Sequence, residues 1–289
     1  TAAELEFSPR AYTRRTKSNR VKEKSGLGPV MLLLDDHGEE DPVRDGIMPV
    51  VSQNLSRYGI EHQYINQSRL RENPELLKEF KGIVFCNDLK GIQLPENYPG
   101  VQVFGWEARG PALDRITTND DEIVSLAVEY LCRAGVKRAV IIWQRNMVQI
   151  PRHPRIACFL ERMNELGIQA APMPFDREEP DFSGRMKELI SSGDDRIGFF
   201  GFNALCGVKL CCALESLGLL RKYSPHSVLV CDKSLLLNGF FPRPAMIDLN
   251  LPAMAERAVN LLIGRLGKPE YPGILMLQSP RLLLSQEQL

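Results

Sequence analysis

Apolar residues along this chain gather in short continuous runs that alternate with longer amphipathic stretches. Runs without polar interruption are typical of strands that are covered by helices on both faces of a parallel sheet. The pattern predicts strands at 29–34, 61–66, 82–86, 101–104, 137–143, 197–200 and 227–231, and a final strand region at 274–284 that Pro280 interrupts.

The stretches between these runs have apolar residues at helical spacing. In the stretch after the strand at 197–200, Leu205, Val208 and Cys212 recur on one face, and Gly218 supplies a stop signal. Helices are predicted at 43–58, 74–80, 120–135, 151–166, 204–217 and 253–266. Strands and helices alternate through two successive sets, which predicts an α/β protein with two doubly wound parallel-sheet lobes facing each other. A cleft between such lobes is a common ligand site.

Polar side chains stand where two of the predicted strands end. Asn203 follows the strand at 197–200, and Asp232 follows the strand at 227–231. Open parallel sheets bind ligands outside the carboxyl ends of their strands, so both side chains are candidate ligand contacts. Asn203 is equally suited to cap the helix that follows it. The pattern leaves both interpretations open.

Composition narrows the class of protein. The chain has 289 residues, of which 44% are hydrophobic and 25% charged, as expected for a globular protein of two moderate domains. Its seven cysteines include no C-x-x-C pair, which favours free thiols in a reducing cytosol. No apolar stretch reaches the roughly 18–20 residues of a membrane span, and no signal-peptide core is visible. We therefore expect a cytoplasmic protein without a membrane partner.

The net charge of zero hides a basic segment near the N-terminus. Residues 10–24 contain seven Lys or Arg and one Glu, a net charge of plus six. Ser8 and Pro9 suit the start of a short basic helix that would follow them, and 21–28 resembles a linker. A solvated tail and a nucleic-acid contact are both compatible with this segment.

Motifs of catalysis are missing from the sequence. It contains no G-x-S-x-G, no H-E-x-x-H and no phosphate-binding G-x-x-x-x-G-K-[ST]. The acidic loop at 35–41 lacks the oxygen spacing of a calcium loop. His153, beside Arg152 and Arg155, is a conceivable base, yet no nucleophile stands near it. We expect no metal, no cofactor and no enzymatic activity.

Several segments, in order along the chain, match one set of motifs. Residues 5–14, LEFSPRAYTR, are similar to L-G-Y-x-P-N-x-x-A-R. RIACF at 155–159 fits R-x-x-G-[FW], FGFN at 200–203 fits F-x-x-N-D, and VCD at 230–232 fits [VI]-x-[GF]-x-D. With these segments the chain resembles, across essentially its whole length, the LacI/GalR (lactose repressor) family of bacterial transcription regulators. Residues 5–14 then resemble the family's hinge helix, 117–121, TTNDD, its lobe-crossing segment, and 126–138 the helix and turn after it.

The resemblance implies a periplasmic-binding-protein-like fold of type I, whose chain crosses between the lobes three times. On this basis 1–27 is a remnant of the hinge helix and linker. The first lobe combines 28–118 with 247–270, and the second combines 119–246 with 271–289. The resemblance also implies a homodimer, for which the predicted helix at 43–58 carries apolar surface that would reach beyond its own lobe.

The resemblance also implies a function, that of a ligand-responsive DNA-binding regulator with a carbohydrate effector. The expected effector contacts are Arg155, Asn203, Asp232, Trp106 and Asp36. Operator DNA would be bound through a helix-turn-helix headpiece that is missing before Leu5, with hinge contacts from Pro9, Arg10, Arg14 and Arg15. The alternative is a solute-binding protein of the same fold that serves sugar transport.

The chain departs from the family's pattern at three positions. Thr16 stands where many members insert a leucine into the minor groove. Ala204 replaces the usual aspartate after Asn203, and Gly105 replaces an acid that sugar-binding members often carry, for which Glu107 is a possible substitute. These departures leave the operator contact and the identity of the effector open.

Overall fold

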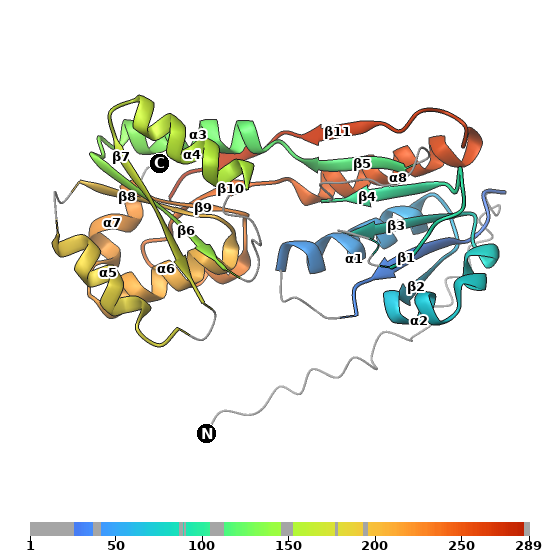
Figure 1. The fold of residues 1–289 in the computed structure, drawn as a ribbon, viewed down its shortest axis with the longest axis horizontal. Helices are drawn as coiled ribbons and strands as arrows, with labels where there is room; N and C mark the ends of the chain where they lie inside the picture. The colour runs from blue at the N-terminus through green and yellow to red at the C-terminus, as the bar shows by residue number, and fades with distance from the viewer. Residues whose placement is uncertain are drawn as a thin grey trace, which may run out of the picture.

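The computed structural model describes residues 26–36, 42–86, 89, 91–104, 113–145, 153–176, 179–192 and 196–285, with the side chains of 42–45 excepted. Within these residues the chain forms two lobes, each built on a six-stranded sheet with helices on both faces (Figure 1). The two-lobed, mainly parallel α/β architecture predicted from the alternating pattern is confirmed.

The first lobe has an entirely parallel sheet. Its strands are, in spatial order, β11 (Leu275–Gln278), β5 (Leu113–Thr118), β4 (Gly100–Val103), β3 (Gly82–Cys86), β1 (Val30–Leu34) and β2 (His62–Asn66). Val30 and Leu32 of β1 pack against α1 (Pro42–Arg57) and α8 (Leu251–Gly267). Met31 and Leu33 pack on the other face with α2 (Gln67–Glu72) and the 3-10 helix η2 (Pro74–Glu79). Burial on both faces explains why β1 has no polar alternation.

Helix α1 uses its apolar side inside its own lobe. Ile47, Val51 and Leu55 are fully buried in the core that α1 shares with α8. The expectation that this helix carries apolar surface for a dimer stays a prediction, since Pro49 is exposed, Val50 is partly buried, and the side chain of Val43 lies outside the described residues. Tyr58, just beyond the helix, remains half exposed and donates its hydroxyl to Asn260 of α8.

The second lobe has five parallel strands and one antiparallel edge strand. Its strands are, in spatial order, β12 (Arg281–Leu283), β10 (Ala245–Asp248), β9 (Val228–Cys231), β8 (Ile197–Gly201), β6 (Arg138–Gln144) and β7 (Gln169–Phe175). Its helices are α3 (Asp120–Arg133), α4 (Pro154–Glu165), α5 (Phe182–Ser191), α6 (Ala204–Ser216), α7 (Leu220–Ser227) and the 3-10 helix η3 (Leu235–Gly239).

Two glycines let helices approach the central strand β8 on opposite faces. A Cβ on Gly198 would lie 2.8 Å from Leu131 of α3, and one on Gly201 would lie 3.1 Å from the backbone nitrogen of Gly207 in α6. Neither side chain can be added unless a neighbour moves. The close packing fixes where α3 and α6 begin relative to the end of β8.

The chain passes between the lobes at Asn119, at 249–250 and at 279–280. The Asn119 amide donates to the Gln278 carbonyl at 3.1 Å, so the first and third crossings lie side by side. The third crossing differs from the boundary expected at 270–271. Leu275 pairs with Arg115 in parallel, which places β11 in the first sheet, and the lobe changes only at the break made by Pro280.

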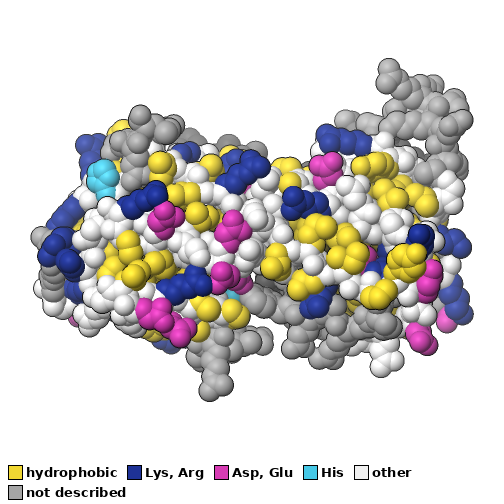
Figure 2. Space-filling model, turned by 90° about the horizontal axis from the view of Figure 1, so that it is seen from above, with side chains coloured by type: hydrophobic (Ala, Val, Ile, Leu, Met, Phe, Trp, Pro, Cys, Tyr) yellow, Lys and Arg dark blue, Asp and Glu magenta, His cyan; other side chains and the backbone are white. Residues whose placement is uncertain are grey.

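Apolar side chains are also visible on the surface. They gather over the first lobe in the view from above (Figure 2), the side on which the edge strand β11 lies in Figure 1. Ile274, Leu275 and Leu277 are each about half exposed. No helix among the described residues is both long and apolar enough to cross a membrane.

Candidate functional site

Arg155 lies in the first turn of α4 and is 6% exposed. Its Nε and Nη2 donate to one oxygen of Asp120, Oδ1, at 3.0 and 2.7 Å. Its Nη1 donates to the carbonyl of Phe202 at 2.8 Å. Asp120 is the first residue of α3, and Phe202 directly follows β8. The guanidinium thus joins the starts of two helices to the end of the central strand.

Aromatic contacts complete the surroundings of this guanidinium. Its central carbon lies 4.6 Å from the centroid of the Phe202 ring, a cation–π distance. The His153 ring packs edge-on against the same phenyl ring at 4.9 Å and accepts a hydrogen bond from the Arg155 amide at 3.2 Å. Arg155 is therefore held in one orientation by both polar and aromatic neighbours.

Asn203 and Asp232 stand at the ends of β8 and β9, as predicted. The Asn203 Oδ1 accepts from the Cys206 amide at 3.0 Å, so the capping interpretation is confirmed. Asp232 has a positive φ of 72°, which is uncommon for a residue with a Cβ and costs about 1–3 kcal/mol. Its side chain is buried and accepts from the Cys231 thiol at 3.4 Å. Strain of this kind is typical of ligand sites.

Burial and neighbouring charges shift the pKa values of Arg155 and His153. Burial lowers the pKa of Arg155, but Cys231, Asp120 and Asp232 outweigh it, and the pKa rises above its usual value. Burial, reinforced by the Arg155 charge and opposed by Asp120, lowers the pKa of His153 to about 4. At neutral pH Arg155 is therefore charged and His153 is neutral.

Two polar atoms near the carboxyl edge of this sheet are buried without a hydrogen-bond partner among the described residues. One is Oδ2 of Asp120, whose side chain is 10% exposed, and the other is the indole Nε1 of Trp143 on β6. Buried polar groups in native proteins are rarely left unpaired, so each calls for an explanation.

The other expected effector contact within the described residues lies elsewhere. Asp36 follows β1 in the first lobe, accepts from the Ser68 amide at 2.6 Å and forms an ion pair with Arg71. Both of these partners belong to α2 of the first lobe. Trp106 and the expected DNA contacts Pro9, Arg10, Arg14 and Arg15 lie outside the described residues, as does Glu107.

Asp120 was missed by sequence reasoning. It belongs to the 117–121 segment, whose acidic residues match an ordinary helix start, where carboxylates favour the helix dipole. Its place directly after a crossing between lobes was the signal that could have singled it out. The structure brings together Arg155 and Asp232 of the expected set, with Asn203 next to Phe202, and adds Asp120 and His153.

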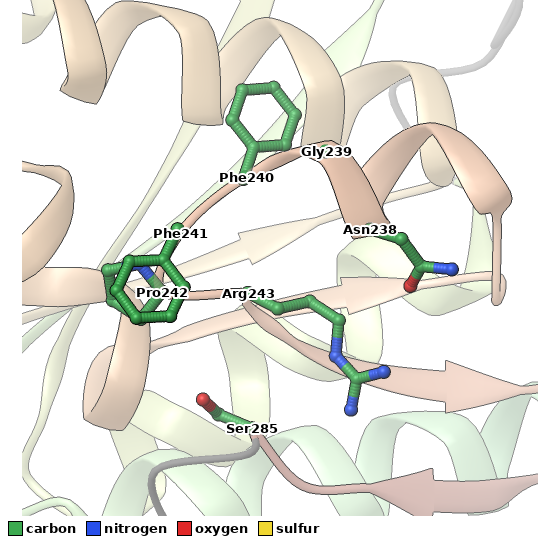
Figure 3. Close-up of a pocket in the computed structure, with 7 residues that line it drawn as sticks. All are labelled: Asn238, Gly239, Phe240, Phe241, Pro242, Arg243 and Ser285. Carbon is green, nitrogen blue, oxygen red and sulfur yellow. The ribbon is translucent and has the colours of Figure 1, made fainter.

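A separate cavity of about 380 Å³ lies at the other end of the second lobe (Figure 3). It is lined by 238–243 and Ser285, where the chain enters β10, whereas the crossing follows the opposite end of that strand. The Arg243 guanidinium lies between Asn238 and Ser285, and the Phe240 ring points away (Figure 3). This cavity shares no residue with the Arg155 cluster. Within the described residues, no group of three or more His, Cys, Asp or Glu side chains is placed to hold a metal ion.

Comparison with known proteins finds the fold in solved structures. No family profile and no curated protein matches the sequence. A LacI family transcriptional regulator from Arthrobacter sp. FB24, in complex with lactose, is 18% identical with a TM-score of 0.73 over 90% of this chain and 98% of that one. A LacI family transcriptional regulator from Enterococcus faecium with bound ribose is 17% identical, with a TM-score of 0.70 over 89% and 97%.

A third similar structure is described both as a periplasmic binding protein and as a LacI transcriptional regulator. It is a periplasmic binding protein/LacI transcriptional regulator from Alkaliphilus metalliredigens QYMF, complexed with D-xylulofuranose, and is 16% identical with a TM-score of 0.68 over 89% and 97%. At these identities the likeness concerns the fold, and it extends over both lobes. The chain therefore has the two-lobed fold of LacI-type regulators and periplasmic binding proteins.

Proposed function

We propose that this chain is the effector-binding core of a ligand-responsive transcription regulator, with a small carbohydrate bound between the lobes and no catalytic role. The observation that carries the proposal is the buried cluster of Asp120, Arg155 and Asp232 at the carboxyl ends of the second sheet. Asp120 directly follows the crossing residue Asn119, so the cluster lies beside the junction of the lobes. Ligands of open α/β sheets bind at such strand ends.

The chemistry of the cluster supports a hydroxyl-rich ligand. Carboxylates accept from hydroxyl groups, amides both donate and accept, and the Phe202 ring offers an apolar surface. Asn203 and Asp232 are the proposed direct contacts, and Arg155, whose donors already serve Asp120 and Phe202, orients them. The lactose, ribose and D-xylulofuranose in the similar structures support the same class of ligand.

A ligand that contacts both lobes would control the conformation of the protein. A ligand shifts a conformational equilibrium by the difference in its affinity for the two states. We propose that closure of the lobes around the effector changes how a homodimer presents its DNA-binding segments, with Pro9, Arg10, Arg14 and Arg15 as hinge contacts. Light scattering should return twice the chain mass of 32.6 kDa.

A thermal-shift screen over neutral mono- and disaccharides tests the ligand proposal. A bound sugar at about 100 times its Kd should add about 2.7 kcal/mol to the free energy of unfolding and raise the Tm. No shift across pentoses, hexoses and disaccharides would contradict it. A solute-binding protein for transport would show the same shifts, but no sugar-dependent change in DNA binding, so the DNA titration separates the two functions.

A further inference from the structure

The two oxygens of the Asp120 carboxylate have different surroundings. Oδ1 accepts both hydrogen bonds from Arg155, whereas Oδ2 is buried and has no partner among the described residues. Because two donors of Arg155 hold Oδ1, the direction in which Oδ2 points is fixed as well. An unpaired buried carboxylate oxygen is costly, and a donor that arrives there recovers the cost.

Carboxylates gather around this oxygen. Arg155 is the single cation of the cluster within the described residues, and Asp120 and Asp232 both act on its charge. Of two further cations, Arg162 pairs with Asp121 and Lys233 lies 3.6 Å from Asp248. A negatively charged ligand at Oδ2 would therefore approach buried carboxylates.

A second buried group, the indole of Trp143, needs a different kind of partner. Ile141 pairs with Phe200, whose ring contacts Phe159 of α4, and strand alternation places Trp143 on that same side of β6. The indole Nε1 can only donate, and it is buried without an acceptor among the described residues. A hydroxyl group both donates and accepts, so it can serve an acceptor such as the Asp120 Oδ2 as well as a donor such as the Trp143 Nε1.

We propose that Asp120 is a specificity-determining residue of the effector site: its Oδ2 accepts from a hydroxyl or ammonium group of the ligand, and the site selects neutral and amino sugars over sugar phosphates and sugar acids. The inference rests on the proposed function and specifies its ligand class. A phosphate or carboxylate presents acceptors to Oδ2 and brings negative charge close to the buried carboxylates of Asp120 and Asp232. A buried site discriminates strongly against a ligand whose charge would be left there without a partner.

Calorimetry on matched ligands tests the selection in the unaltered chain. The pairs are D-ribose with D-ribose 5-phosphate and D-glucose with D-glucose 6-phosphate, with D-gluconate and D-glucosamine added. Whichever parent sugar binds should bind at least about 100-fold more tightly than its phosphate, in line with an unpaired buried charge. D-glucosamine should bind at least as well as D-glucose, because its ammonium group can serve Oδ2.

Asp120→Asn tests the residue itself, since it keeps the shape of the side chain and removes its charge. Binding of the parent sugar should weaken about tenfold or more. The ratio of the affinity for the sugar to the affinity for its phosphate should shrink. Asp121→Asn is the matched control: that neighbour is exposed, pairs with Arg162, and should leave both quantities unchanged. The Tm of each variant without ligand reports whether it is folded.

Each outcome has a defined meaning. A sugar phosphate or sugar acid that binds more tightly than its neutral parent overturns the inference and leaves the proposed function standing. An unchanged affinity and an unchanged sugar-to-phosphate ratio in Asp120→Asn would do the same. If no sugar and no derivative binds, the proposed function fails, and the inference fails with it. The comparison in the unaltered chain decides the matter even if the variant does not fold.

Discussion

Arg155 and its carboxylate neighbours, Asp120 and Asp232, form one charged unit, which loses its single cation among the described residues when Arg155 is removed. Arg155→Ala leaves Asp120 and Asp232 buried beside each other, and breaking a buried pair in this way costs about 3–5 kcal/mol. We expect a correspondingly lower free energy of unfolding in urea titrations and loss of sugar binding in calorimetry. Arg162→Ala, which removes a more exposed ion pair, should change stability by less than about 1 kcal/mol. Equal losses in the two variants would contradict the assigned roles.

Asp232 belongs to the same unit but serves the ligand more directly. Asp232→Ala should weaken binding of the true sugar by about a hundredfold, the usual consequence of losing one charge-assisted hydrogen bond worth about 2–3 kcal/mol. Part of the stability cost should be offset, because alanine removes a buried carboxylate. Calorimetry that returned an unchanged Kd would place the site elsewhere.

His153 predicts a pH dependence of stability. Its folded-state pKa is lowered to about 4 by burial and by Arg155, against 6.5 in the unfolded chain. The unfolded state therefore binds the extra proton first as pH falls, so this contribution to stability is complete above about pH 6.5 and is lost between that value and pH 4. His153→Asn keeps a cap acceptor and removes the titration. Between pH 7 and pH 5, denaturant titrations should show a larger loss of stability in the unaltered chain than in the variant.

Some residues of the cluster could be predicted from the sequence and others could not. Asn203 and Asp232 were accessible because strand ends are visible as the end of an apolar run. Asp120 looked like any acid in a first helical turn, and its burial depends on Arg155, which is 35 residues away in the sequence. Pairings of this length leave no local pattern, so the unpaired oxygen that now carries the ligand inference could not be predicted.

At the scale of elements, the contact between β8, β9 and α6 fixes the geometry of the strand ends. A Cβ on Gly207 would lie 2.3 Å from Cγ1 of Val230, so Gly207→Ala must push α6 away from β9. We expect a loss of about 1–3 kcal/mol in denaturant titrations, together with weaker sugar binding, because Asn203 and Asp232 lie at the ends of these elements.

Gly264→Ala in α8 is the control for that variant. An added Cβ there meets nothing within 4 Å, and the position is exposed in a helix interior. The substitution should be neutral or stabilise the protein by up to about 1 kcal/mol, since alanine is the better helix former. If both alanine variants behaved alike, the close approach of α6 would not be what holds the site.

Strands with one continuous apolar run were predictable, and the largely polar strand β5 was not. β1, β3 and β8 match their predicted positions closely. β5 was missed because four of the six residues in its sequence, LDRITT, are polar. Its Asp114 is buried through an ion pair with Arg265 of α8, 151 residues later. The Arg265 guanidinium also donates to the carbonyls of Pro269, Tyr271 and Pro272. The strand is thus stabilised by a partner that its own sequence does not reveal.

At the scale of the whole molecule, the charge distribution predicts how this chain binds DNA. Residues 10–24 carry a net charge of plus six, which favours phosphate contacts but does not read base edges. We expect weak binding to two duplexes of unrelated sequence, with similar affinities that fall steeply as salt rises. Fluorescence anisotropy at two salt concentrations measures this, and the chain without residues 1–24 is the control. Tight binding to one duplex at physiological salt would show that the segment itself reads sequence.

The three crossings have a consequence for how the protein is made. Neither lobe is a continuous piece of chain, since the first sheet needs β11 and its core needs α8, both from the C-terminal part. During synthesis, the first lobe emerges early, yet Val30, Val84 and Ile116 stay without the cover of Met254, Val259 and Leu262 until α8 has been made, and the sheet lacks β11 until residue 278. By then all but the edge strand of the second sheet has been synthesised. The lobe that begins first therefore stays incomplete while almost all of the second lobe is made, and its exposed sheet is the surface that chaperones would have to protect in the meantime.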